Sequence, residues 1–121
     1  MCAAGTCMPT PDQARELIRR GYGARLARYE PIGPQGQMRP AFIAPALAGA
    51  EGETLRSTSG GPCTCFVDGK CELHAAGLKP EEGRIASHDR SAGDVRLAVY
   101  RTWMGRRYAS VLATLNSALA R

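Results

Sequence analysis

The chain has 121 residues, of which 44% are hydrophobic and 6% aromatic, and it carries a formal net charge of +5. This length fits a single domain, 1–121, and the thin apolar core that it implies favours an additional stabilising element such as a bound metal. The sixteen Lys and Arg residues form no long block and do not alternate with aromatic residues, which argues against a nucleic-acid surface.

The sequence shows no targeting or membrane-spanning segment. Its first ten residues, MCAAGTCMPT, lack the basic start and the apolar run of about 7 to 15 residues that a secretory signal needs. No stretch reaches the roughly 20 apolar residues of a membrane span. We therefore expect a cytoplasmic protein without membrane association, in which clustered cysteines bind metal or carry out redox chemistry more often than they form structural disulfides.

The first predicted helix begins after Thr10 as N-cap, with Pro11 at the first helical position and Gln13 completing a capping box. Apolar residues then recur at near-helical spacing: Ala14, Leu17, Ile18 and Leu26. We expect this helix to end at Gly21, and residues 24–29 to form another short helical turn.

The middle of the chain is predicted to be extended or irregular. Three prolines and two glycines in 31–40 indicate a loop. Residues 41–48 are apolar, but Pro45 argues against a central strand, so we expect an edge strand or an extended packing segment. The polar, glycine-bearing residues 49–61 are expected to form a surface connection.

Two helices are predicted toward the C-terminus. Ser91 is placed as a cap for the first, which ends at Gly105. Its apolar face consists of Val95, Val99 and Trp103. The second has the clearest amphipathic pattern in the sequence, formed by Tyr108, Val111, Leu112, Leu115 and Leu119. Both faces are expected to pack on the core.

Potential metal ligands are concentrated in the segment 63–74, CTCFVDGKCELH, which contains three cysteines and one histidine. Cys71 and His74 are three residues apart, so a helical turn would place both on the same side. Cys2 and Cys7 precede the first predicted helix and bring two further thiols. Sulfur and imidazole nitrogen suit zinc, which takes four ligands in a tetrahedron. The predicted metal ligands are therefore Cys2, Cys7, Cys63, Cys65, Cys71 and His74.

The dipeptide Asp-Gly at 68–69 predicts a β-hairpin whose loop length determines where the thiols point. A two-residue loop pairs Phe66 with Cys71 and places Cys71 on the opposite face from the other two cysteines. A three-residue loop that begins at Val67 instead sets Cys65 opposite Cys71 and brings all three sulfurs to one face, because strand side chains alternate. Binding one metal ion through all three thiols requires a register of the second kind.

Several motifs accompany these cysteines. They are C-x4-C followed by PTP (2–11), a helix ending in IRRGY (18–22), C-x7-CELH (63–74), GLKP (77–80) and EGR (82–84). This combination resembles the YkgJ-like cysteine-cluster family of zinc- or iron-chelating domains and covers most of residues 1–90. The resemblance implies a bacterial protein with dispersed cysteines around a metal ion, and the positions that match the family's cysteines are Cys2, Cys7, Cys63 and Cys71.

The chain departs from this family's pattern in three places. Cys65 stands where the family more often has an apolar residue, and Cys7 is followed by Met8 where many members have a second cysteine. Gly83 occupies a position at which many members have a cysteine. Either His74, His88 or Cys65 supplies the missing ligand, or the site is smaller than in the family.

These observations predict a small α+β protein, mostly helical, with a short cysteine-bearing β-hairpin and a metal-stapled core. The metal is expected to be zinc, with iron as the alternative, and to be mainly structural by tying the N-terminus to the hairpin. Arg84 is a candidate to neutralise thiolate charge. The resemblance implies no particular biochemical role or protein partner.

Three other functional classes fit the sequence less well. A metal-dependent hydrolase would use Glu72, Glu81 or Glu82 as a base, but the chain has no H-E-x-x-H motif and thiolates usually build closed structural sites. A thiol redox protein is disfavoured because C-x-x-C is absent. An adaptor that binds nucleic acid or an acidic partner through its arginines is compatible with a structural zinc. The sequence favours a non-catalytic role without deciding whether the protein is an enzyme.

Overall fold

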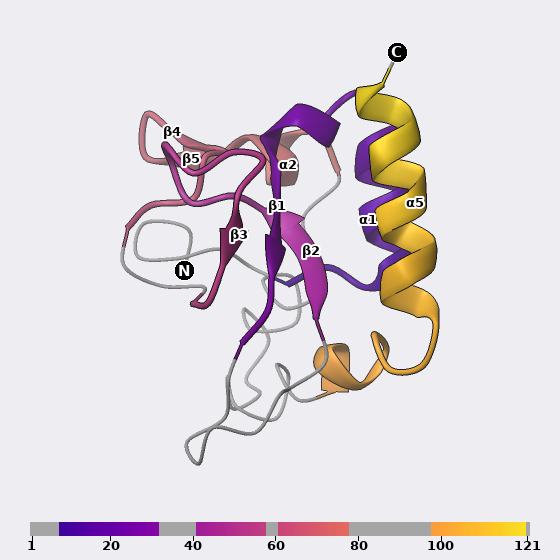
Figure 1. The fold of residues 1–121 in the computed structure, drawn as a ribbon. Coiled ribbons are helices and arrows are strands. Elements are labelled where there is room, and N and C mark those ends of the chain that lie inside the picture. The colour runs from indigo at the N-terminus through magenta and orange to yellow at the C-terminus, as the bar shows by residue number, and fades with distance from the viewer. Residues whose placement is uncertain (1–7, 32–40, 58–60, 78–97, 121) are drawn as a thin grey trace.

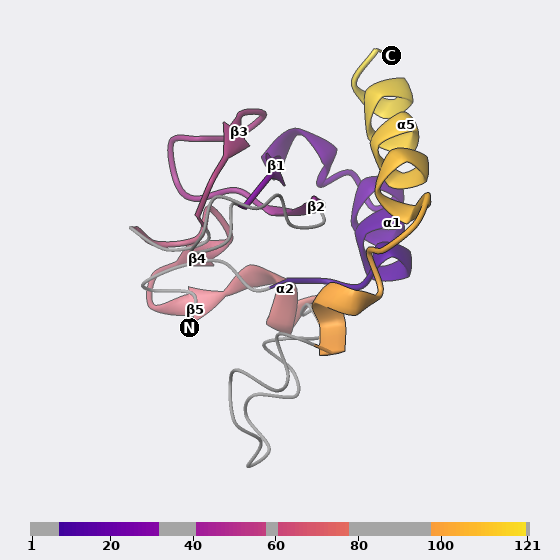
Figure 2. The same ribbon diagram turned by 60° about the horizontal axis from the view of Figure 1, so that its bottom comes forward.

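The computed structural model describes residues 8–31, 41–57, 61–77 and 98–120. Within these ranges the protein is a small α+β fold, as predicted. A three-stranded sheet packs on one side against two helices, and a two-stranded hairpin lies beyond the sheet, on the side away from the C-terminal helix, in both views (Figure 1, Figure 2). None of the helices in the described ranges is long and apolar enough to cross a membrane.

Helix α1 (Pro11–Arg19) begins at the predicted capping box. The backbone N–H of Gln13 donates to Thr10 Oγ1 at 3.2 Å, and the N–H of Thr10 donates to Gln13 Oε1 at 3.0 Å. These reciprocal bonds satisfy two backbone groups that have no partner within the helix. The buried face contains Ala14, Leu17 and Ile18, as the spacing predicts.

The predicted helical turn at 24–29 is wrong for most of its length. A short 3₁₀ helix occupies Gly23–Arg25, but Leu26–Tyr29 form strand β1, the centre of the sheet. Leu26, Ala27 and Tyr29 are all buried, because a central strand is covered on both faces. A short apolar run of this kind has no periodicity that separates a strand from a helix.

The strands on either side of β1 differ in how well the sequence indicates them. Strand β2 (Phe42–Pro45) pairs antiparallel with β1 and lies at an edge of the sheet, which confirms the predicted edge strand around Pro45. Strand β3 (Thr54–Leu55) pairs parallel with β1. It falls in a segment predicted as a connection, and two residues are too few to give an alternating pattern.

Helix α5 (Arg107–Leu119) packs on α1, and its buried residues are Val111 and Leu115. Before it, residues 98–101 are helical. Gly105, predicted to interrupt the helical segment, has a φ of +79° and lies between this helix and α5. Trp103 is fully buried and its indole N–H donates to the Pro9 carbonyl at 2.9 Å. The predicted cap at Ser91 lies outside the described residues.

Candidate metal centre

The first two cysteines of the 63–74 segment lie in a tight turn at the margin of the apolar core. Cys63 forms an isolated antiparallel bridge with Leu47, and the N–H of Phe66 donates to the Cys63 carbonyl at 2.9 Å. The intervening Thr64 N–H donates to the Ala46 carbonyl at 2.8 Å. These bonds direct both thiols inward, so that Cys63 is 3% and Cys65 1% exposed.

A hydrogen bond to sulfur links the two buried cysteines. The backbone N–H of Cys65 donates to Cys63 Sγ at 3.4 Å. An N–H that points at a thiolate helps to hold its negative charge, which is one way in which proteins tune sulfur ligands of metals. The turn therefore aims a backbone N–H at Cys63 Sγ.

The hairpin that follows adopts the two-residue loop. Strand β4 (Phe66–Val67) pairs antiparallel with β5 (Lys70–Cys71), and Phe66 lies opposite Cys71. Asp68 and Gly69 have φ angles of +52° and +77°, as a type I′ turn requires. The three-residue loop that would align all three thiols by strand alternation is therefore not formed.

Strand alternation nevertheless does not decide where the thiols lie, because Cys63 and Cys65 precede β4 and belong to the turn. The N–H of Glu72 donates to the Cys65 carbonyl at 2.8 Å, which ties the turn directly to the residue after Cys71. The hydrogen bond with Cys63, burial, and the nearby sulfurs of Cys63 and Cys71 raise the pKa of the Cys65 thiol. Cys63 and Cys71 therefore both lie near enough to Cys65 to affect its charge.

Arg25 is the main positive charge at this site, and the sequence patterns did not indicate it. Its Nη1 donates to Glu72 Oε2 at 2.6 Å and its Nη2 donates to the Thr64 carbonyl at 2.9 Å. These partners are 47 and 39 residues away in the chain, so no local motif could reveal the contact. The positive charge of Arg25 acts to lower the pKa of Cys65, against the larger effects that raise it.

Two acidic side chains near the turn are engaged in hydrogen bonds. The bond from Arg25 lowers the pKa of Glu72, the carboxylate that a hydrolase mechanism would use as a base. On the other side of the turn, Thr64 Oγ1 donates to Glu51 Oε1 at 2.8 Å. Glu51 thus accepts a hydrogen bond from the side chain of Thr64, and Arg25 donates one to its backbone carbonyl.

The structure brings part of the predicted ligand set into one region. The structure describes the three cysteines of the 63–74 segment. His74 lies in helix α2 (Glu72–Ala75), within one helical turn of Cys71. Among the described residues, no three Cys, His, Asp or Glu side chains form a group that could hold a metal ion. The side chain of His74 and several other residues of interest lie outside the described part: Cys2, Cys7, Glu81, Glu82, Arg84 and His88.

The described residue nearest in sequence to the N-terminal cysteines is Met8, which follows Cys7 directly. Met8 is 1% exposed and belongs to the same apolar cluster as Cys63, Cys65 and Leu73. The residue that follows Cys7 in the sequence therefore lies in the core that also contains the cysteine turn.

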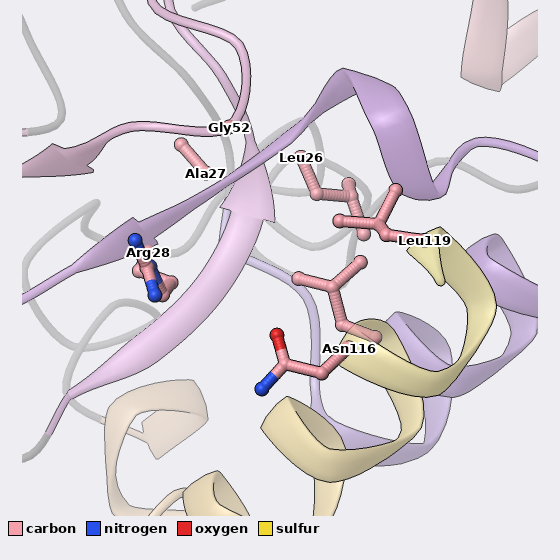
Figure 3. Close-up of a pocket in the computed structure, with 7 residues that line it drawn as sticks. Leu26, Ala27, Arg28, Gly52, Asn116 and Leu119 are labelled. Carbon is pink, nitrogen blue, oxygen red and sulfur yellow. The ribbon is translucent and has the colours of Figure 1, made fainter. Parts of the chain in front are cut away.

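A cleft of about 150 Å³ lies elsewhere, between β1 and the C-terminal half of α5 (Figure 3). Its walls are mostly apolar, with Arg28 and Asn116 as the polar side chains among the residues that line it. It contains none of the predicted metal ligands and is separate from the cysteine turn.

Comparison with known proteins gives this chain no relatives: no protein-family model, no curated protein and no solved structure matches it. The resemblance to the YkgJ-like family therefore stays a prediction that rests on the motifs alone.

Proposed function

We propose that this protein binds a metal ion, zinc with iron as the alternative, through ligands drawn from Cys63, Cys65 and Cys71. Further ligands come from the remaining candidates Cys2, Cys7 and His74. The observation that carries the proposal is the turn in which two buried cysteines are joined by a hydrogen bond from the backbone N–H of Cys65 to Cys63 Sγ, with Cys71 near enough to Cys65 to raise its pKa. A bound cation would remove the repulsion between neighbouring thiolates, since it deprotonates and neutralises coordinating sulfur.

The chemistry of the donors favours zinc. Thiolate with imidazole suits its tetrahedral coordination, and the cysteine spacing matches no regular iron–sulfur pattern. The described thiols do not form a group of three that could hold a metal ion. The proposal therefore requires at least one ligand from Cys2, Cys7 or His74, and the burial of Met8 beside Cys7 supports the N-terminal cysteines.

A mainly structural role is favoured over catalysis. Glu72 is bound by Arg25, so this carboxylate is not poised to accept a proton from water. A metal shared by Cys7 and the turn would close a loop of more than fifty residues, which removes entropy from the unfolded chain. We place this metal in a reducing, cytoplasmic environment, where thiolate ligands persist.

Thiol redox chemistry and nucleic-acid binding receive less support. A buried thiol with a raised pKa, such as Cys65, is a poor nucleophile at neutral pH. On α1, the exposed arginines are paired with acids, Arg19 and Arg20 with Glu16 and Arg15 with Asp12. These pairs weaken the positive field that a nucleic-acid surface would need.

The direct test is metal analysis of untagged protein purified under reducing conditions, with thiols titrated before and after chelation. We expect about one zinc per chain, released together with newly reactive thiols. The double substitution Cys63→Ser, Cys65→Ser should abolish zinc binding. Lys70→Ala is the matched control, because Lys70 is exposed and adjoins Cys71. A stoichiometry near zero in fresh reduced wild-type protein overturns the proposal.

A further inference from the structure

Arg25 joins the two segments that carry the described cysteines. One arm of its guanidinium binds the carbonyl of Thr64, the residue between Cys63 and Cys65. The other arm binds Glu72, the residue after Cys71 and the first of helix α2. A single side chain from outside the 63–74 segment therefore bridges the cysteine turn and the end of the hairpin, which the backbone bond from Glu72 to Cys65 also joins.

The environment of Arg25 fixes its orientation. The guanidinium carbon lies 5.7 Å from the centre of the Tyr22 ring, within the range of a cation–π contact. The side chain of Arg25 is 32% exposed, so it is more protected from water than Arg19 and Arg20, which are 68% and 52% exposed in their pairs with Glu16. A partly buried, two-armed contact of this kind is more specific than an ordinary surface ion pair.

We propose that Arg25 is a positioning residue of the metal centre: it holds the ligand-bearing turn against the start of α2 and compensates the negative charge of the thiolates. This inference rests on the proposed metal binding. A centre with several thiolates carries net negative charge even when zinc is bound, so a nearby fixed cation stabilises the loaded state. Arg25 itself donates no electron pair and is not a ligand.

The guanidinium is suited to this task in a way that an ammonium is not. Its planar fork contacts two acceptors at once, here a carbonyl and a carboxylate on different segments. Lysine at position 25 would keep the positive charge but would reach the two acceptors less well. The two contributions, charge and geometry, can therefore be separated by substitution.

The test compares Arg25→Gln with Arg20→Gln, a control that also removes one arginine but leaves the cysteine turn intact. Arg20 pairs with Glu16 on α1. Zinc affinity is measured by competition with a chromophoric chelator, and Co²⁺ substitution reports the ligand geometry through its sulfur charge-transfer and d–d bands. We expect Arg25→Gln to weaken zinc binding by about 10- to 100-fold, the range found for residues that orient metal ligands, and to change the Co²⁺ spectrum. Arg20→Gln should change neither.

Two further variants separate the mechanism from a loss of folding. Arg25→Lys should restore part of the affinity, and Glu72→Gln should weaken binding to a smaller extent because the charge of Arg25 is retained. Circular dichroism of each metal-free variant checks that the fold is kept. If Arg25→Gln does not fold, the zinc affinities of Arg25→Lys and Glu72→Gln test the role of Arg25 instead.

The possible outcomes distinguish this inference from the proposed function. If wild-type protein binds zinc but the folded Arg25 variants bind it equally well with an unchanged Co²⁺ spectrum, the role of Arg25 is overturned while metal binding stands. If wild-type protein binds neither zinc nor Co²⁺, the metal centre itself is wrong.

Discussion

The helix–sheet core and the cysteine segment, 61–77, share one apolar cluster but differ in the polar contacts that hold them. In the core, α1 and α5 pack against strand β2 through fully buried apolar side chains such as Leu17, Phe42 and Val111. The cysteine segment consists of two-residue strands and a four-residue helix, and its contacts to the rest of the chain include polar bonds from Arg25 and Glu51.

This difference shows where a metal would matter. A two-stranded hairpin is at best marginally stable by itself, whereas a core with buried aromatic and aliphatic side chains stabilises its own elements. Phe42, for example, stacks on Tyr29 with ring centres 5.1 Å apart. We therefore expect the core to be insensitive to metal and the cysteine segment to depend on it.

The largest expected effect concerns the core. Trp103→Ala removes a fully buried indole and its hydrogen bond to Pro9, and should lower the free energy of unfolding by about 3 to 5 kcal/mol. Urea denaturation measures this loss, which should be similar with and without a chelator. Met104→Ala, at a side chain 58% exposed, is the neighbouring control and should cost little. A loss below about 1 kcal/mol for Trp103→Ala would contradict the assignment of this residue to the core.

The second prediction addresses the cysteine segment by hydrogen exchange. The amides of Thr64, Phe66 and Glu72 donate backbone hydrogen bonds within or beside the turn. With free zinc at about 100 times its dissociation constant, local opening that releases the metal should be suppressed about 100-fold. Chelation should therefore speed exchange of these amides by about that factor, while the Arg28 amide, bound to the Glu53 carbonyl in the sheet, should change little. Equal acceleration at both places would show that the two regions are not distinct.

The third prediction tests the hairpin loop. Asp68 has a positive φ in the two-residue turn, a conformation that costs a β-branched residue about 1 to 2 kcal/mol. Asp68→Val should destabilise the protein by that amount in urea denaturation, whereas Asp68→Asn, which tolerates this conformation, should be nearly neutral. In a three-residue loop only Gly69 would need a positive φ, so a harmless Asp68→Val would favour that register.

The smallest effect is the pH dependence of the pair formed by Arg25 and Glu72. The hydrogen bond from Arg25 lowers the pKa of Glu72, so the folded protein binds this proton less tightly than the unfolded chain does. The pair therefore adds stability above the ordinary carboxyl pKa of about 4.3, and this stability is lost as the pH falls below that value. Melting temperatures at pH 6 and pH 3 should differ less in Glu72→Gln than in wild type. When Arg25 is already replaced by Gln, adding Glu72→Gln should leave the difference between the melting temperatures at pH 6 and pH 3 unchanged.

The sequence predicted the parts of the fold that have strong local signals. The capping box at Thr10 and the amphipathic pattern of 108–119 predicted α1 and α5, because caps and helical periodicity are local properties. Strand β1 was missed because the burial of Leu26–Tyr29 depends on strands that follow much later in the chain. The two-residue strand β3 gave no pattern at all.

For the candidate metal centre, the spacing of the cysteines identified the segment but not its geometry. The sequence left both hairpin loops open, and the structure has the loop that was expected to split the thiols. Cys63 and Cys65 lie in a turn rather than in a strand, so strand alternation does not place them, but the three described thiols form no group that could hold a metal ion. Arg25 was missed because its contacts join residues that are far apart in sequence.

The most direct test of the metal centre is zinc-edge X-ray absorption on reduced, untagged protein, compared with Cys65→Ser. The proposed site predicts a sulfur shell at about 2.3 Å with at least three sulfur neighbours in wild type and one fewer in the variant. Zinc surrounded by nitrogen and oxygen alone, or a sulfur shell unchanged by Cys65→Ser and by Cys63→Ser, would contradict it.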